Sequence, residues 1–258
     1  MIPRNDQAAL RGHFDKELRS RVRLDLFVQR PSPVIIPGRP ECPFCEEVQT
    51  LVQEIAGLSP KISPTLHDFY SATKAAADLG VDRIPAIVLR GKSNRPMRFF
   101  GMPTGGQFPV LIDTLIETSR DETPLTLETI KQLKRIREDV RLQVFVAPSC
   151  PHSPPVARTA FRLAQQSNRV KADVYEATEF PDLAQHFRVT ATPAVVINET
   201  LVLEGAMDEA TVVDLLLKVV EGKPIAGDKV ATGGSTPLSF AQQPQEVRLA
   251  GSGLILPR

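Results

Sequence analysis

Two cysteines whose spacing suits redox chemistry stand in the first fifth of the chain. Cys42 and Cys45 occur as Cys-Pro-Phe-Cys, at the start of a segment that predicts a helix over residues 43–56. A sulfur at a helix N-terminus is favoured as a thiolate, because unpaired amides and the helix dipole stabilise negative charge there. Cys42 is therefore the candidate nucleophile, and Cys45 is the candidate second thiol that would close a disulfide with it.

The pattern recurs in an altered form 108 residues later. Cys150 begins the sequence Cys-Pro-His-Ser, in which Ser153 stands where the first copy has its second cysteine. A serine hydroxyl does not attack sulfur at neutral pH, so Cys150 can attack a disulfide but needs a thiol from elsewhere for release. His152 is a candidate for tuning, because its positive charge would lower the pKa of Cys150. A solvated side chain is an equally good interpretation of His152.

A proline follows the first cysteine of each pattern at the same distance of 43 residues. Ile84-Pro85 belongs to the first copy and Thr192-Pro193 to the second. Each proline precedes a predicted strand, and X-Pro is the common place for a cis peptide bond. A cis bond beside the thiol would present the backbone of the preceding residue to an extended peptide. We therefore predict that these four residues bind substrate.

These coincidences indicate an internal duplication. Residues 22–28 and 140–146 have similar apolar sequences offset by 118, which places a ten-residue, proline-containing insertion within 29–40 of the first copy. Each copy predicts the order strand, helix, strand, helix, strand, strand, helix, and a further helix precedes the first copy. This order predicts an α/β fold with two tandem domains, each a mixed central sheet flanked by helices.

The predicted domains cover residues 1–120 and 121–221, and a tail rich in glycine and proline covers 222–258. Between the domains, Thr123 is the expected N-cap and Pro124 the expected first residue of the next helix. The tail composition is typical of a disordered extension. An arm that packs on its own body, or on a second copy in a homodimer, is the alternative.

Composition excludes several classes of protein. The chain has 258 residues with 31 basic and 30 acidic side chains, so a net charge of +1 provides no field that attracts nucleic acid or an anionic membrane. No apolar stretch is long enough for a membrane span, and no secretory signal is visible. Three cysteines are too few for a disulfide-rich secreted scaffold and do not provide a zinc ligand set. We expect a cytoplasmic protein without a metal.

Each half resembles a thioredoxin-fold unit, and the chain resembles the two-unit protein disulfide oxidoreductases that are also called glutaredoxin-like. The likeness runs over about residues 6–220 and is strongest in 98–106, 118–123 and 144–151. The resemblance implies thiol–disulfide exchange with protein substrates and electrons from a thioredoxin-reductase-type flavoprotein. It places the redox sites at Cys42/Cys45 and at Cys150, where Ser153 departs from the family pattern. We expect the Cys42–Cys45 disulfide to be the redox group, with no other cofactor.

Two other functions stay open. A peptide-binding or chaperone-like protein is favoured by Ser153 and by the insertion. An enzyme linked to glutathione or to a peroxiredoxin, acting through the single thiol of Cys150, is favoured by the Cys-Pro-His-Ser sequence. Asp25 is close to the position of the buried acid that thioredoxins keep behind the redox pair. It is one residue out of register, which turns it to the other face of the strand, so we interpret Asp25 as structural.

Overall fold

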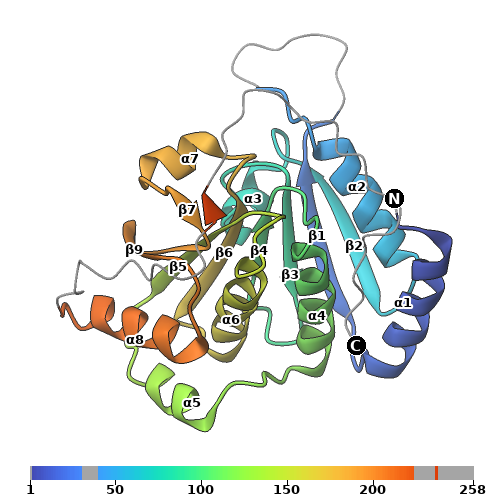
Figure 1. Cartoon of the computed structure of the whole chain (residues 1–258). Helices are drawn as coiled ribbons and strands as arrows, with labels where there is room; N and C mark the ends of the chain where they lie inside the picture. The colour runs from blue at the N-terminus through green and yellow to red at the C-terminus, as the bar shows by residue number, and fades with distance from the viewer. Residues whose placement is uncertain (1, 31–39, 224–235, 238–258) are drawn as a thin grey trace.

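The computed structural model describes residues 2–30, 40–223 and 236–237, and Figure 1 shows a sheet with helices on both faces. The insertion at 29–40 and the tail at 222–258 therefore lie largely outside the described residues. The elements of the first half are α1 (Arg4–Glu17), β1 (Val22–Val28), α2 (Cys45–Ala56), β2 (Ile62–Asp68), α3 (Thr73–Leu79), β3 (Ala86–Arg90), β4 (Met97–Phe100) and α4 (Gln107–Arg120). Those of the second half are α5 (Leu127–Leu133), β5 (Val140–Val146), α6 (Ser153–Gln166), β6 (Val170–Glu176), α7 (Pro181–His186), β7 (Ala191–Thr192), β8 (Ala194–Ile197), β9 (Thr200–Glu204) and α8 (Glu209–Val220).

The two halves have the same strand order. The first half contributes β2-β1-β3-β4 and the second β6-β5-β8-β9, and the two sets join edge to edge as one eight-stranded sheet. In each set the first two strands are parallel and the remaining neighbours antiparallel. The junction is a parallel pair, β4 with β6, in which Phe100 lies opposite Tyr175. The predicted mixed α/β architecture is confirmed, and the sheets of the two halves are continuous.

Side chains alternate across the sheet and build a separate core on each face. Leu24, Leu26 and Val28 of β1 face one core with α1, α2, α4, α6 and α8, whereas Phe27 faces the other core with α3 and α7. This alternation follows from the two-residue period of an extended strand. Figure 1 views the face that α2, α4 and α6 cover, with α3 behind the sheet.

Polar contacts between the halves reinforce the β4–β6 junction. Arg98 on β4 forms a buried ion pair with Asp173 on β6. On one face α4 packs on α6, where the Arg162 Nε lies 2.9 Å from a carboxylate oxygen of Glu117. These contacts hold the two halves in one orientation, so the loops that follow β1 and β5 have fixed positions.

The helix between the halves begins later than predicted. Thr123 and Pro124 do not start it; Thr126 is the N-cap, and its side-chain oxygen accepts a hydrogen bond of 3.1 Å from the Thr129 amide. The Glu209 carboxylate on α8 accepts further hydrogen bonds from both threonines. The start of α5 is therefore tied to a contact with α8, which is distant in the sequence.

Candidate redox site

The Cys42–Cys45 pair lies where the chain enters α2. The two sulfurs form a disulfide of 2.03 Å, and the Cys45 amide donates to the Cys42 carbonyl at 3.3 Å in the turn that precedes the helix. Cys45 is the first residue of α2 and is buried, whereas Cys42 is partly exposed. The outer sulfur is therefore the one that a substrate can reach.

The inner sulfur is also held by the backbone. Cys45 Sγ accepts a hydrogen bond of 3.2 Å from the amide of Gln29, the residue that follows β1. Reduction of the disulfide would leave Cys45 next to this amide and below Cys42. This arrangement suits a sulfur that attacks from within once Cys42 has bonded to another sulfur.

Both predicted proline bonds are cis. Ile84-Pro85 and Thr192-Pro193 are the cis peptide bonds of the chain's described residues, as the spacing predicted. Phe27 pairs with Ala86 across β1 and β3, which places Pro85 beside the end of β1, from which the chain leads toward Cys42. Ile84 is partly exposed and Pro85 is buried.

The second site repeats this local geometry with a different sulfur content. The Ser153 amide donates to the Cys150 carbonyl at 3.3 Å, as the Cys45 amide does in the first half. The amide of Ala147, the residue after β5, donates to Ser153 Oγ at 3.4 Å. Ser153 thus takes the structural contact of Cys45 without its redox chemistry.

The structure brings Cys150 and Thr192 together. Cys150 is 1% exposed, and its Sγ donates to the Thr192 carbonyl at 3.3 Å. Thr192 is fully buried, and Pro193 follows it. His152 is half-buried at the N-cap of α6, directly ahead of Ser153. The predicted residues of the second half therefore form one cluster, but its thiol is covered.

The structure supports a structural role for Asp25. Its carboxylate accepts a hydrogen bond of 3.0 Å from Arg90 Nε, and its other oxygen lies 2.9 Å from His67 Nε2. Asp25 is 4% exposed on β1, with both partners on adjacent strands. This network ties β1 to its two neighbours.

Glu179 is a site residue that the sequence analysis missed. Its Oε1 accepts a hydrogen bond of 2.7 Å from the amide of Met102 in the other half. Burial raises the pKa of Glu179 to about 8, and the charges of Glu176 and Glu47 add to this effect. Glu47 lies in the first turn of α2, two residues after Cys45. A carboxyl group that holds its proton at neutral pH thus reaches from the second half toward the first site.

The loop after β4 brings the two halves close to each other near the second site. The Gly106 amide donates to the Pro148 carbonyl at 3.4 Å, and Pro148 precedes Cys150 by two residues. Gly105 has a φ of +53°, and a Cβ there would lie 2.5 Å from the same carbonyl oxygen. Sequence alone could not find this contact, because it depends on the β4–β6 junction.

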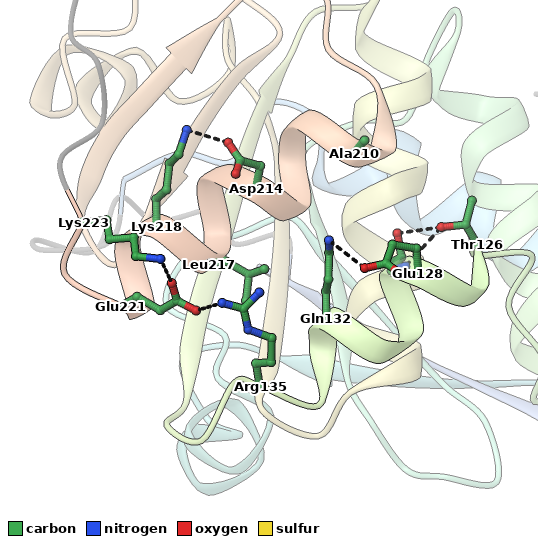
Figure 2. A pocket seen from close by; sticks show the side chains of 11 residues that line it. Thr126, Glu128, Gln132, Arg135, Ala210, Asp214, Leu217, Lys218, Glu221 and Lys223 are labelled. Carbon is green, nitrogen blue, oxygen red and sulfur yellow. Dashed lines mark hydrogen bonds and ion pairs between the residues drawn. The ribbon is translucent and has the colours of Figure 1, made fainter.

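Two cavities of the molecule lie away from the cysteines. A cavity of about 250 Å³ between α5 and α8 is lined by charged residues, many of which are paired with each other. Figure 2 shows Lys218 with Asp214, and Glu221 between Arg135 and Lys223. A second cavity, of about 590 Å³, lies next to α3 and β6 and likewise contains none of the predicted site residues.

The described part of the chain lacks two further kinds of feature. In residues 2–30, 40–223 and 236–237, no cluster of histidine, cysteine and acidic residues could hold a metal ion. Within the same ranges, no helix has the length and apolar character needed to cross a membrane.

Comparison with known proteins identifies the fold of the chain. A family model described as thioredoxin domain matches residues 140–217. The alkyl hydroperoxide reductase protein AhpF of Xanthomonas campestris pv. phaseoli is 25% identical over 161 residues, which cover 62% of this chain and 29% of that protein. The chain spans less than a third of the length of several such curated relatives.

Solved structures match over most of the chain. A protein disulfide oxidoreductase from Aeropyrum pernix K1 has a TM-score of 0.75 at 23% identity and covers 86% of this chain and 95% of its own. The N-terminal N/C domain of the alkyl hydroperoxide reductase AhpF from Enterococcus faecalis has a TM-score of 0.72 at 20% identity, with 84% and 100% covered. Residues 140–217 are thus a thioredoxin domain, and the whole chain has the two-unit fold of these thioredoxin-superfamily structures.

Proposed function

We propose that the protein is a dithiol–disulfide oxidoreductase that exchanges disulfides with protein substrates through Cys42 and Cys45. The observation that carries the proposal is the asymmetry of the pair: Cys42 is partly exposed ahead of α2, and Cys45 is buried within it. The similarity to a solved protein disulfide oxidoreductase supports this function. The redox group in this proposal is the disulfide itself, without another cofactor.

The reaction starts from the reduced pair. The Cys42 thiolate attacks one sulfur of a substrate disulfide, which forms a mixed disulfide and releases the other substrate sulfur as a thiolate. The Cys45 thiolate then attacks Cys42 Sγ, so the second substrate sulfur leaves and the Cys42–Cys45 disulfide closes. The substrate gains two electrons and two protons, and the protein loses them. The partly exposed backbone at Ile84 is positioned to receive an extended segment of the substrate.

A second protein must reduce the Cys42–Cys45 disulfide before the next turnover. We propose a thioredoxin-reductase-type flavoprotein as the electron donor and a peroxiredoxin as a further partner. The similarity to components of alkyl hydroperoxide reductases supports a place in such an electron-transfer chain. We place the protein in the cytoplasm, where dithiols of this kind stay reduced.

Reduction of insulin disulfides with dithiothreitol as electron donor tests the proposal. We expect Cys42→Ser to reduce the rate to that of dithiothreitol alone, because no sulfur is left at the exposed position. Cys45→Ser retains the attacking sulfur, so it should accumulate a mixed disulfide with insulin that mass spectrometry can detect. Turnover by Cys42→Ser at the wild-type rate would contradict the proposal.

Cys150→Ser separates the contributions of the two sites. Cys150 is 1% exposed, which weighs against a monothiol enzyme that acts through it. We expect this variant to keep most of the insulin-reducing activity. Activity that disappears in Cys150→Ser and persists in Cys42→Ser would instead favour the monothiol function.

A further inference from the structure

A short strand from the C-terminal tail lies against the second site. β10 (Thr236–Pro237) pairs antiparallel with β7, with Thr236 opposite Thr192 and Pro237 opposite Ala191. Figure 1 draws β10 in red beside β7. These two strands form a small sheet of their own, apart from the eight-stranded sheet.

The residue that β10 pairs with is the one that contacts the thiol. The Thr192 carbonyl accepts the hydrogen bond of 3.3 Å from Cys150 Sγ, and Thr192 is the residue bonded to Pro193. The tail segment therefore runs along the backbone next to Cys150. Addition of a strand to an exposed backbone edge is a general way to bind an extended peptide, because main-chain hydrogen bonds supply the affinity.

The duplication provides an internal comparison. The turn at Cys42 and the turn at Cys150 have the same amide-to-carbonyl contact of 3.3 Å, so their local backbones correspond. Cys42 and Ile84 are partly exposed, whereas Cys150 is 1% exposed and Thr192 fully buried. Among the described residues, Ile84 belongs to no strand, while Thr192 is paired with β10. The covered site is the one against which the tail strand lies.

We propose that the tail segment at Thr236–Pro237 is an internal ligand of the second half, which occupies a peptide-binding position along β7 and shields Cys150. Because ligand and site belong to one chain, the effective concentration of the segment is high, on the order of millimolar. An external peptide would have to displace it before reaching Cys150. The inference rests on the pairing of β7 with β10 and not on turnover at the first site.

Alkylation of the oxidised protein measures the shielding directly. When Cys42 and Cys45 form their disulfide, Cys150 is the one remaining thiol of the three cysteines, so iodoacetamide uptake reports on it alone. We compare the full-length protein with Thr236→Pro, because proline has no amide hydrogen for a strand pair. We expect Cys150 to react at least about ten times faster in this variant, a change of about 1.4 kcal/mol in the closed state.

Thr236→Val is the matched control. Valine keeps the amide and suits an extended backbone, so Cys150 should stay as slow to react as in the wild-type protein. A synthetic peptide of residues 230–243 should slow the reaction of the Thr236→Pro protein again, and the same peptide with proline at 236 should not. Thermal unfolding of Thr236→Pro, monitored at equal pH, checks that the thioredoxin-fold halves remain folded.

Three outcomes would overturn the inference. Equal alkylation rates in Thr236→Pro and wild type would mean that β10 does not shield Cys150. Faster alkylation accompanied by a lower unfolding temperature, without recovery on addition of the peptide, would assign the effect to general destabilisation. Protection that disappears when the wild-type protein is diluted a hundredfold would place the tail on a second copy instead. Failure of insulin reduction would leave this alkylation result unchanged, so the two proposals fail separately.

Discussion

Cys45 and Ser153 occupy equivalent positions and accept a hydrogen bond from the amide that follows the central strand of their half. Their backbone environment is therefore the same, and their chemistry differs because only sulfur can exchange in a disulfide. The first site can close on itself, and the second cannot. At this scale one atom decides whether a copy of the site can complete a redox cycle.

Glu179 gives a prediction about pH. Its carboxyl holds a proton up to a pKa of about 8 in the folded protein, against the ordinary pKa of 4.5 that applies to the unfolded chain. As pH rises from 4.5 to 8, the unfolded chain loses this proton and the folded protein keeps it, so the free energy of unfolding falls. Glu179→Gln has no such proton and should lose less stability over this range.

Urea unfolding of both proteins at pH 5 and pH 8 measures this effect. The stability of wild type relative to Glu179→Gln should drop by about 1 kcal/mol or more between the two pH values, since one pKa unit corresponds to about 1.4 kcal/mol. Glu176, whose pKa burial also raises, is present in both proteins and contributes equally. Parallel pH profiles would show that Glu179 is ionised in the folded protein.

The element that joins the halves is the end of β4, where the chain turns at Gly101. Gly101 has a φ of +99°, and a Cβ there would lie 2.8 Å from the Glu176 Cβ and 3.0 Å from Glu179 Oε1. The close approach allows the Met102 amide to reach Glu179. A side chain at this position would therefore separate β4 from the segment after β6.

Gly101→Ala should lower the free energy of unfolding by about 2–4 kcal/mol, because steric overlap and an unfavourable φ act together. Gly12→Ala is the matched control: Gly12 lies within α1, where a Cβ would meet nothing within 4 Å. Alanine there should stabilise the protein by about 0.5–1 kcal/mol through helix propensity. Denaturant midpoints measure both changes, and equal effects of the two substitutions would refute the packing argument.

The whole molecule is organised around one sheet that crosses both halves. β4 and β6 share main-chain hydrogen bonds, and Arg98 and Asp173 form a buried ion pair across the same junction. Neither half can unfold without exposing this pair and the edge strand of the other half. A buried charge that loses its partner costs about 3–5 kcal/mol, which favours a joint transition.

We therefore expect the two halves to unfold as one cooperative unit. Native-state hydrogen exchange should report similar opening free energies for the slowest amides of β3 in the first half and β8 in the second, within about 1 kcal/mol. The Cys42–Cys45 disulfide is kept oxidised in this measurement. A separation of several kcal/mol between β3 and β8 would indicate two independently stable domains.

Local patterns were enough to predict much of the fold and part of the site. The 108-residue and 43-residue spacings predicted the repeated turns at Cys42 and Cys150 and the cis bonds at Pro85 and Pro193. The start of α5 was predicted wrongly, because Thr123 and Pro124 have suitable local propensity but Glu209 on α8 holds Thr126 and Thr129. A distant contact outweighed the local preference.

The sequence by itself determined the two copies, their element order and the sulfur content of each site, because these depend on residue type and short spacing. Tertiary structure decided that the sheets join at β4 and β6, that Glu179 reaches Met102, and that β10 lies along β7. Each of these contacts involves the backbone, which is chemically alike at almost every residue. Their partners lie 44 to 77 residues apart in the chain, and folding alone brings them together.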